Sequence, residues 1–271
     1  MANFKLNGIK YQRKNKSVWD EYREELERNG FVILKNIFPL DLVHKLQSAY
    51  DLAIEQNLKF YSSKNINLTP KEFGIIRQIY RFNEIFLDAI MNPNVTEFID
   101  NVLDDKWIIS QQNGSHLDYD NVDFDNIGLQ VWHRDFVYRH LTTSKPLLIN
   151  MLVPLDPFTR ENGATNLIPG SHLHPEFPSD EFVQKNVQFA EAQPGDAIVL
   201  NGLTYHSAGQ NKKAVKRRSF NTVFAIPAFS HQVAPFPDGT TKEFIAKYGN
   251  ILTGGYPTQP SVTEFIKSKN K

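Results

Sequence analysis

Apolar residues in the first hundred positions recur at the spacing of amphipathic helices. Ser17 is a typical helix N-cap, and Gly30 is typical of a helix end. The apolar run 31–38 predicts a short strand between two helices, and Pro93 breaks the last helical stretch in two. The helical pattern covers residues 17–30, 39–57 and 72–103.

From about residue 106 the pattern changes to short apolar or alternating runs, separated by clusters of turn-forming residues. Many short strands of this kind predict a sandwich or a jelly roll. The polar segment 112–127 predicts a mobile loop between the first two of these strands. The predicted strands lie within residues 106–112, 127–136, 146–155, 165–170, 187–193, 196–202 and 217–227.

We expect one domain over residues 1–271, because no internal repeat or long linker divides the chain. Its helix-rich support covers about residues 1–105 and its β core about 106–230. A C-terminal helix and tail cover about 231–271. The fold class is therefore mainly β with a helical N-terminal part.

Composition excludes several classes of function. The formal net charge is zero, so no global field attracts the chain to nucleic acid or to an anionic membrane. The chain has no cysteine, which excludes disulfides and thiolate metal sites and fits a reducing compartment. We find no signal peptide and no apolar run of the ~18 residues that a spanning helix needs. A cytoplasmic location is expected.

The stretch "VWHRDF", residues 131–136, places a histidine and an aspartate two positions apart. In a strand, His133 and Asp135 would point to the same side and Arg134 to the other. Such a pair could bind a metal, or it could be a surface pair near a strand end. His172 and His174 form a competing pair with the same spacing in "PGSHLHP".

His206 is the best candidate for a third ligand, because it follows the buried run "DAIVL" at the end of a predicted strand. With His133 and Asp135 it completes the two-histidine, one-carboxylate set that binds non-haem Fe(II). A 2-oxoacid that chelates such an iron needs a cation for its far carboxylate, and Arg217 follows His206 by eleven residues. The alternative is that "KKAVKRR", residues 212–218, is a basic surface loop that binds nucleic acid.

Four segments, in this order, resemble the phytanoyl-CoA dioxygenase (PhyH-like) family of Fe(II)/2-oxoglutarate-dependent oxygenases. "ERNGFVILKNIFPLDLVHKLQ" is similar to the opening helix, strand and helix of the family. "QVWHRDF" resembles the strand with the His-x-Asp pair, and "LINMLVPLDPFTRENGATNLIPGSH" resembles the strand and loop that follow it. "AQPGDAIVLNGLTYHSAGQNKKAVKRRSFNTVF" is similar to the last segment, with the distal histidine and the arginine.

The resemblance implies a double-stranded β-helix, a jelly roll of the cupin-like kind, with iron at its wide end. By position, His133, Asp135 and His206 would bind Fe(II), and Arg217 would bind the far carboxylate of 2-oxoglutarate. Two further positions, Gln130 and Asn150, match family positions that contact the co-substrate.

One position departs from the family. Several relatives have a serine two residues after the distal histidine, where it assists the arginine, and this chain has Ala208. Ser207 or Thr222 would then have to supply the missing hydroxyl, or Arg217 would act with fewer partners.

The implied reaction consumes 2-oxoglutarate and O2, releases succinate and CO2, and hydroxylates an unactivated C–H of a small molecule. Asp135 argues against halogenation, because halogenases of this superfamily have a small residue there. Demethylation, desaturation and cyclisation stay open. The candidate substrate contacts are Phe136, Tyr138, Arg139, Ser171, His172 and Tyr205.

Two other classes of function remain open from the sequence. A jelly-roll metal-binding protein or isomerase would keep the barrel without turning over 2-oxoglutarate, and it would not need Arg217. A nucleic-acid demethylase or binding module would use residues 212–218 and bind in a salt-dependent way. The neutral charge argues against the second class, and we expect no nucleic-acid or membrane partner.

Overall fold

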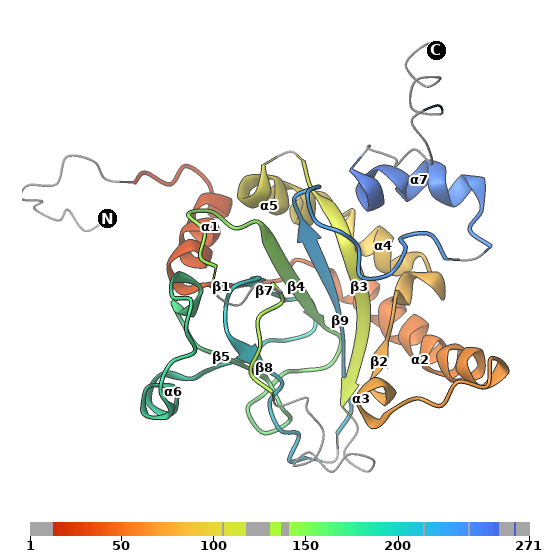
Figure 1. The fold of residues 1–271 in the computed structure, drawn as a ribbon, viewed down its shortest axis with the longest axis horizontal. Helices are drawn as coiled ribbons and strands as arrows, with labels where there is room; N and C mark the ends of the chain where they lie inside the picture. Colours follow the sequence, from red (N-terminus) through yellow and green to blue (C-terminus); the bar gives the residue numbers. More distant parts are fainter. Residues whose placement is uncertain are drawn as a thin grey trace, which may run out of the picture.

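The computed structural model describes residues 13–104, 106–117, 131–136, 141–213, 215–237, 239–254 and 263. A six-stranded antiparallel sheet lies at its centre, with a smaller three-stranded sheet beside it (Figure 1). In spatial order, the larger sheet contains β1 (Phe31–Leu34), β7 (Ala197–Asn201), β4 (Leu148–Pro154), β9 (Arg217–Ala225), β3 (Ile108–Leu117) and β2 (Ile75–Ile76). The smaller sheet contains β6 (Gln188–Ala190), β5 (Thr165–Leu167) and β8 (His206–Ser207).

The two sheets form the predicted jelly roll with a helical N-terminal part. Strands β1 and β2, which come from the helix-rich part of the chain, form the two edges of the larger sheet. Both parts of the chain therefore share one sheet. The three-part division of residues 1–271 stays a prediction.

Most helices precede β3 in the chain. They are α1 (Val18–Asn29), α2 (Leu40–Ser63), α3 (Pro70–Phe73), α4 (Ile85–Ile90) and α5 (Pro93–Leu103), with a 3-10 turn, η1 (Ile79–Arg81). Later in the chain lie η4 (Ser171–Leu173), α6 (Asp180–Asn186) and α7 (Lys242–Thr253). In the part of the chain that the structure describes, no helix has the length and apolar character needed to cross a membrane.

Helix α1 begins and ends where its sequence predicts. The Ser17 hydroxyl accepts a hydrogen bond from the backbone N–H of Asp20, and the Asp20 carboxylate accepts one from the N–H of Ser17, which makes a capping box. Gly30 ends the helix with a φ of 81°. A Cβ at Gly30 would lie 2.4 Å from the Thr204 hydroxyl oxygen, so close packing also requires glycine here.

Two local predictions were wrong. Residues 74–84 do not continue a helix, because β2 pairs with β3 and Gln78 adopts a left-handed backbone with a φ of 48°. Residues 112–117 are not a loop but the second half of β3, paired with β9. In both places strand pairing overrides the local pattern.

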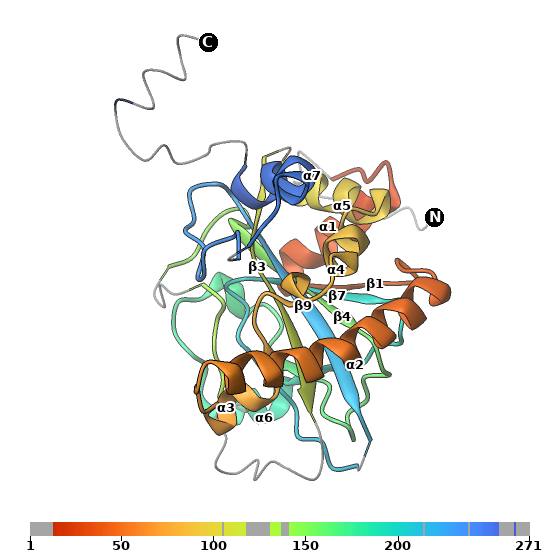
Figure 2. The same cartoon turned by 90° about the vertical axis from the view of Figure 1, so that its right-hand side faces the viewer.

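Helices α2 and α4 cover the outer face of the larger sheet (Figure 2). Phe86 of α4 is fully buried there. Its ring centroid lies 5.3 Å from that of Phe220 on β9 and 6.4 Å from that of Tyr50 on α2. This apolar layer leaves the inner face of the same sheet free to carry polar residues.

Replacing Phe86 with alanine should test this layer. We expect Phe86→Ala to lower the free energy of unfolding by about 3–5 kcal/mol, because it opens a cavity between helix and sheet. Phe73→Ala is the matched control, since Phe73 is 56% exposed, and it should change stability by less than about 1 kcal/mol. Urea unfolding of the three proteins measures both values, and equal losses would contradict the assignment of Phe86 to the core.

Candidate active site

The two candidate histidine ligands lie opposite each other in a single antiparallel bridge. The backbone N–H of His133 donates to the carbonyl of His206, and the N–H of His206 donates to the carbonyl of His133, both at 3.0 Å. Asp135 follows in a bend, and the N–H of Phe136 then donates to the carbonyl of Gly202 at 3.0 Å. In the described part of the predicted strand 127–136, namely 131–136, the structure thus has one bridge and a bend.

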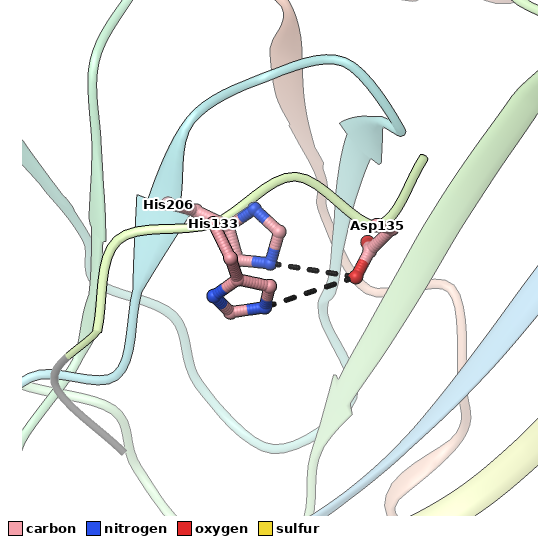
Figure 3. A group of neighbouring side chains, drawn as sticks. All are labelled: His133, Asp135 and His206. Atoms are coloured by element: carbon pink, nitrogen blue, oxygen red, sulfur yellow. Dashed lines mark ion pairs between the residues drawn. The ribbon is translucent and has the colours of Figure 1, made fainter. Parts of the chain in front are cut away.

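The side chains of His133, Asp135 and His206 converge on one point (Figure 3). Asp135 Oδ1 lies 3.9 Å from His133 Nε2 and 3.7 Å from His206 Nε2. One ligand atom from each residue lies within 4.8 Å of the other two. Among the described residues, no other group of three histidine, aspartate or glutamate residues meets this criterion.

Hydrogen bonds to the backbone turn both imidazoles toward that point. His133 Nδ1 lies 2.9 Å from the carbonyl oxygen of Val131, and His206 Nδ1 lies 3.0 Å from that of Thr204. A carbonyl only accepts, so each Nδ1 carries a proton, and in the neutral ring the lone pair is then on Nε2, the atom that faces Asp135. Burial lowers the pKa of His206, and the neighbouring His133 adds to this effect while Asp135 opposes it.

This donor set fits Fe(II). Two imidazoles and one carboxylate are the ligands of the facial triad, and no thiolate competes in a chain without cysteine. The His206 side chain is 8% exposed, whereas that of His133 is 51% exposed. The site therefore has one buried side and one side open to solvent, from which further ligands of a metal could enter.

His133, Asp135 and His206 all line a cavity of about 450 Å³. Its wall combines apolar residues of β4 and β7, such as Leu152 and Leu200, with polar residues of β3 and β9. Besides the triad, the polar residues on the wall are Arg77, Gln111, Asn113, Ser115, Arg134, Asn150, Thr165, Arg217, Ser219, Asn221 and Gln232. The cavity is therefore suited to a polar ligand.

Arg217 lies in this cavity without an acidic partner among the described residues. Its side chain is on β9, the residue is 3% exposed, and its guanidinium carbon lies 3.8 Å from the centroid of the Phe158 ring. Burial lowers the pKa of Arg217 to about 9, which leaves it charged at neutral pH. A buried cation of this kind needs an anion, and the cavity has room for one.

The next residue, Arg218, faces the other side of the strand, as the sequence predicts. Its guanidinium donates to both carboxylate oxygens of Asp156, at 2.8 and 2.9 Å, and to Asp51 at 2.9 Å. Lys216 also lies 3.6 Å from Asp51, and Lys213 lies 2.9 Å from Glu161. Acidic partners therefore compensate much of the basic segment 212–218, although a lack of nucleic-acid binding stays a prediction.

The predicted co-substrate residues have different positions. Asn150 lines the cavity, but its amide nitrogen donates to Asp135 Oδ2 at 2.9 Å. Gln130 lies outside the described residues, as do the candidate substrate contacts Tyr138 and Arg139.

The other predicted substrate contacts do not line this cavity. Tyr205 stacks under Arg134, 4.0 Å from its guanidinium carbon, and its hydroxyl donates to the carbonyl of Pro175 at 3.0 Å. Ser171 accepts from the N–H of Tyr205 at 2.9 Å, and His172 Nε2 donates to the carbonyl of Glu27 at 2.9 Å. Phe136 packs in an apolar cluster with Leu148, Leu203 and Val223. Their contact with a substrate stays a prediction that these positions do not support.

The competing histidine pair does not form a site. His172 is buried and bound to the end of α1, whereas its partner His174 is exposed. Burial lowers the pKa of His172, so the neutral ring donates to Glu27 through Nε2. These contacts give the pair a structural role.

Neither residue expected to replace the hydroxyl missing at Ala208 lies in the cavity. The Ser207 hydroxyl accepts from Asn166 at 3.1 Å, and that of Thr222 accepts from Gln112 on the outer face of the sheet at 3.1 Å. Thr165 and Ser219 do line the cavity together with Arg217, although the Ser219 hydroxyl donates to the carbonyl of Ser115 at 3.3 Å. Alternate positions along β9, namely 217, 219 and 221, point inward. From this period of two, the sequence could have predicted that Ser219 and Asn221 line the cavity together with Arg217.

Exchanging each of the two adjacent arginines for methionine should change stability in opposite directions. We expect Arg217→Met to raise the free energy of unfolding by about 1–3 kcal/mol, because it removes a buried charge without an acidic partner and keeps an apolar contact with Phe158. Arg218→Met should lower it by about 1–3 kcal/mol, since Asp156 loses its partner. Urea unfolding of the metal-free proteins measures both. A loss of stability in Arg217→Met would mean that Arg217 already has an anionic partner in the metal-free protein.

Comparisons with known proteins identify the family and the fold. The family model for phytanoyl-CoA dioxygenase (PhyH) matches residues 26–219. The iron/alpha-ketoglutarate-dependent dioxygenase penM of Penicillium thymicola is 24% identical over 79% of this chain and 69% of its own. Among solved structures, EctD from S. alaskensis with 2-oxoglutarate and 5-hydroxyectoine has a TM-score of 0.65 at 20% identity, over 81% of this chain and 80% of that one. The non-heme alpha ketoglutarate dependent epimerase SnoN from nogalamycin biosynthesis has a TM-score of 0.59 at 14% identity, over 78% of this chain and 81% of that one.

These structures share the jelly-roll fold, and the family match covers the candidate metal ligands His133, Asp135 and His206 as well as Arg217. The chain thus belongs to the phytanoyl-CoA dioxygenase (PhyH) family of iron- and 2-oxoglutarate-dependent dioxygenases.

Proposed function

We propose that this chain is an Fe(II)- and 2-oxoglutarate-dependent dioxygenase that hydroxylates an unactivated C–H of a polar small molecule. His133, Asp135 and His206 would bind the iron. With both groups bound, O2 oxidises 2-oxoglutarate to succinate and CO2, and one oxygen atom enters the substrate as a hydroxyl group. A cytoplasmic location is part of the same proposal.

The observation that carries this proposal is the buried guanidinium of Arg217, which shares a cavity with the triad and has no acidic partner among the described residues. A metal-binding protein or an isomerase without 2-oxoglutarate turnover would have no use for a cation that destabilises the fold. The far carboxylate of 2-oxoglutarate supplies the missing charge. Thr165 lies on the same cavity wall, and its hydroxyl could donate a further hydrogen bond to this carboxylate, whereas the Ser219 hydroxyl donates to the carbonyl of Ser115 at 3.3 Å.

Hydroxylation, rather than another oxidation, is the finer part of the proposal. Asp135 would take the third ligand position on the metal. A halide would need that position, so halogenation is disfavoured. The fold itself does not decide, since a 5-hydroxyectoine complex and an epimerase both adopt it. Hydroxylation is the outcome that needs no further group beyond one substrate C–H near the metal.

The cavity wall supports a polar substrate. Gln111, Asn113 and Ser115 alternate along the inner face of β3, and Arg77 and Gln232 lie on the same wall. Arg77 is held by two hydrogen bonds to Glu72, at 2.7 and 3.0 Å. An apolar molecule bound here could not replace the water that these polar groups lose, which makes its binding costly.

Binding of 2-oxoglutarate tests the proposal directly. Under anaerobic conditions, Fe(II) and 2-oxoglutarate should give the metal-free protein a weak visible charge-transfer band, and Arg217→Met should weaken co-substrate binding about 30-fold or more. Arg218→Met is the matched control and should keep the band. Admitting O2 should then release succinate, and His206→Ala should abolish that release.

Each alternative has its own outcome in this experiment. An intact, folded protein that binds Fe(II) but gives no band would favour the metal-binding protein or isomerase. Equal losses in Arg217→Met and Arg218→Met would show that the effect is not specific to the cavity.

A further inference from the structure

The two oxygens of the Asp135 carboxylate have different surroundings. Oδ1 faces the two imidazoles, at 3.9 Å from His133 Nε2 and 3.7 Å from His206 Nε2. Oδ2 instead accepts a hydrogen bond from the amide nitrogen of Asn150 at 2.9 Å. One oxygen is thus turned toward the metal position while the other is held by the larger sheet.

The amide of Asn150 is in turn oriented by a second amide. Its Oδ1 accepts a hydrogen bond from Asn221 Nδ2 at 3.3 Å. A carboxylate only accepts hydrogen bonds, so the nitrogen of Asn150 must face Asp135 and its oxygen must face Asn221. The three side chains therefore form a chain of hydrogen bonds with one direction, from Asn221 through Asn150 to Asp135.

The two asparagines lie on paired strands of a sheet, whereas Asp135 does not. Asn150 lies on β4 and Asn221 on β9, adjacent strands in the middle of the larger sheet, where Asn150 pairs with Val223 and Leu152 with Asn221. Asp135 lies in a bend after a single bridge. The hydrogen bond from Asn150 thus connects the carboxylate to the middle of the larger sheet.

We propose that Asn221 and Asn150 form a relay that positions the metal-binding carboxylate of Asp135. The sequence suggested that Asn150 contacts 2-oxoglutarate. In this relay it is instead a positioning residue. Its oxygen and one of its N–H groups already have partners. The inference rests on the proposed iron site.

The relay keeps Asp135 a ligand through one oxygen. With Oδ2 bound to Asn150, Oδ1 is the oxygen available to the metal. Bound through Oδ1 alone, the carboxylate would take one position on the metal, and with the two histidines it would leave the other positions for an oxoacid and O2. Hydrogen bonds to ligating carboxylates commonly change metal affinity about 10–100-fold when they are removed.

Metal binding to the apoprotein tests the relay without any turnover. Co(II) is titrated into metal-free wild type, Asn150→Leu, Asn221→Leu and the double variant, and its visible absorption reports binding and coordination. We expect Asn150→Leu to raise the Kd for Co(II) about 10–100-fold and Asn221→Leu to raise it less. Because Asn221 acts through Asn150, the double variant should match Asn150→Leu alone.

The matched control is Asn57→Leu, which makes the same exchange at a buried amide on α2, outside the cavity. Its Kd for Co(II) should equal that of the wild type. Titration of 2-oxoglutarate into the Co(II)-saturated proteins completes the set, and its affinity should be the same in wild type and Asn150→Leu.

The outcomes separate the relay from the proposed function. Unchanged Co(II) binding with weaker 2-oxoglutarate binding in Asn150→Leu would make Asn150 a co-substrate contact and overturn the relay. Independent, additive effects of the two substitutions would overturn it as well. If wild type binds Co(II) but not 2-oxoglutarate, the proposed function fails while the Co(II) titrations still decide the relay.

Discussion

The reciprocal backbone bridge between His133 and His206 is the constraint on which the site depends. It joins two segments 73 residues apart, and its two hydrogen bonds of 3.0 Å fix both histidines at once. Each ring then donates its Nδ1 proton to a carbonyl two residues earlier in its own segment. The two imidazoles are thereby oriented by the backbone itself, before any metal binds. The bend after the bridge brings in Asp135 as the third side chain.

Around this bridge, the two faces of the larger sheet have different roles. The outer face packs against the helices and stabilises the fold, and the inner face lines the cavity. The outer face holds Phe220 and Phe224 against the helices, whereas the inner face carries Arg217, Ser219 and Asn221 on the same strand. The charge of Arg217 costs stability because no described residue neutralises it, while Arg218 one position later has two acidic partners. A fold that keeps such an unpaired cation must be stabilised by its outer layer, and an anionic ligand relieves the cost when it binds.

The sequence predicted those features that depend on neighbouring residues. The caps of α1 and the opposite orientations of Arg217 and Arg218 follow from patterns within a few positions. The triad and the jelly roll could be predicted because the spacing and the order of the motifs resemble one family. Residues 74–84 and 112–117 were assigned wrongly, because there the structure depends on the pairing of β2 with β3 and of β3 with β9. A polar strand that lines a polar cavity has the composition of a loop.

The hydrogen bonds behind the triad could not be predicted for a related reason. Asn150 and Asn221 are 71 positions apart, and their contact depends on the register between β4 and β9, which no local pattern specifies. A lone amide in the apolar strand of Asn150 signals only that some partner exists. The alternation of polar residues along β9 likewise shows that Asn221 faces inward, but not what it contacts. Once the register is known, the direction of both amides follows from the charge of Asp135, because a carboxylate can only accept and so fixes the nitrogen of Asn150 toward it and the oxygen toward Asn221.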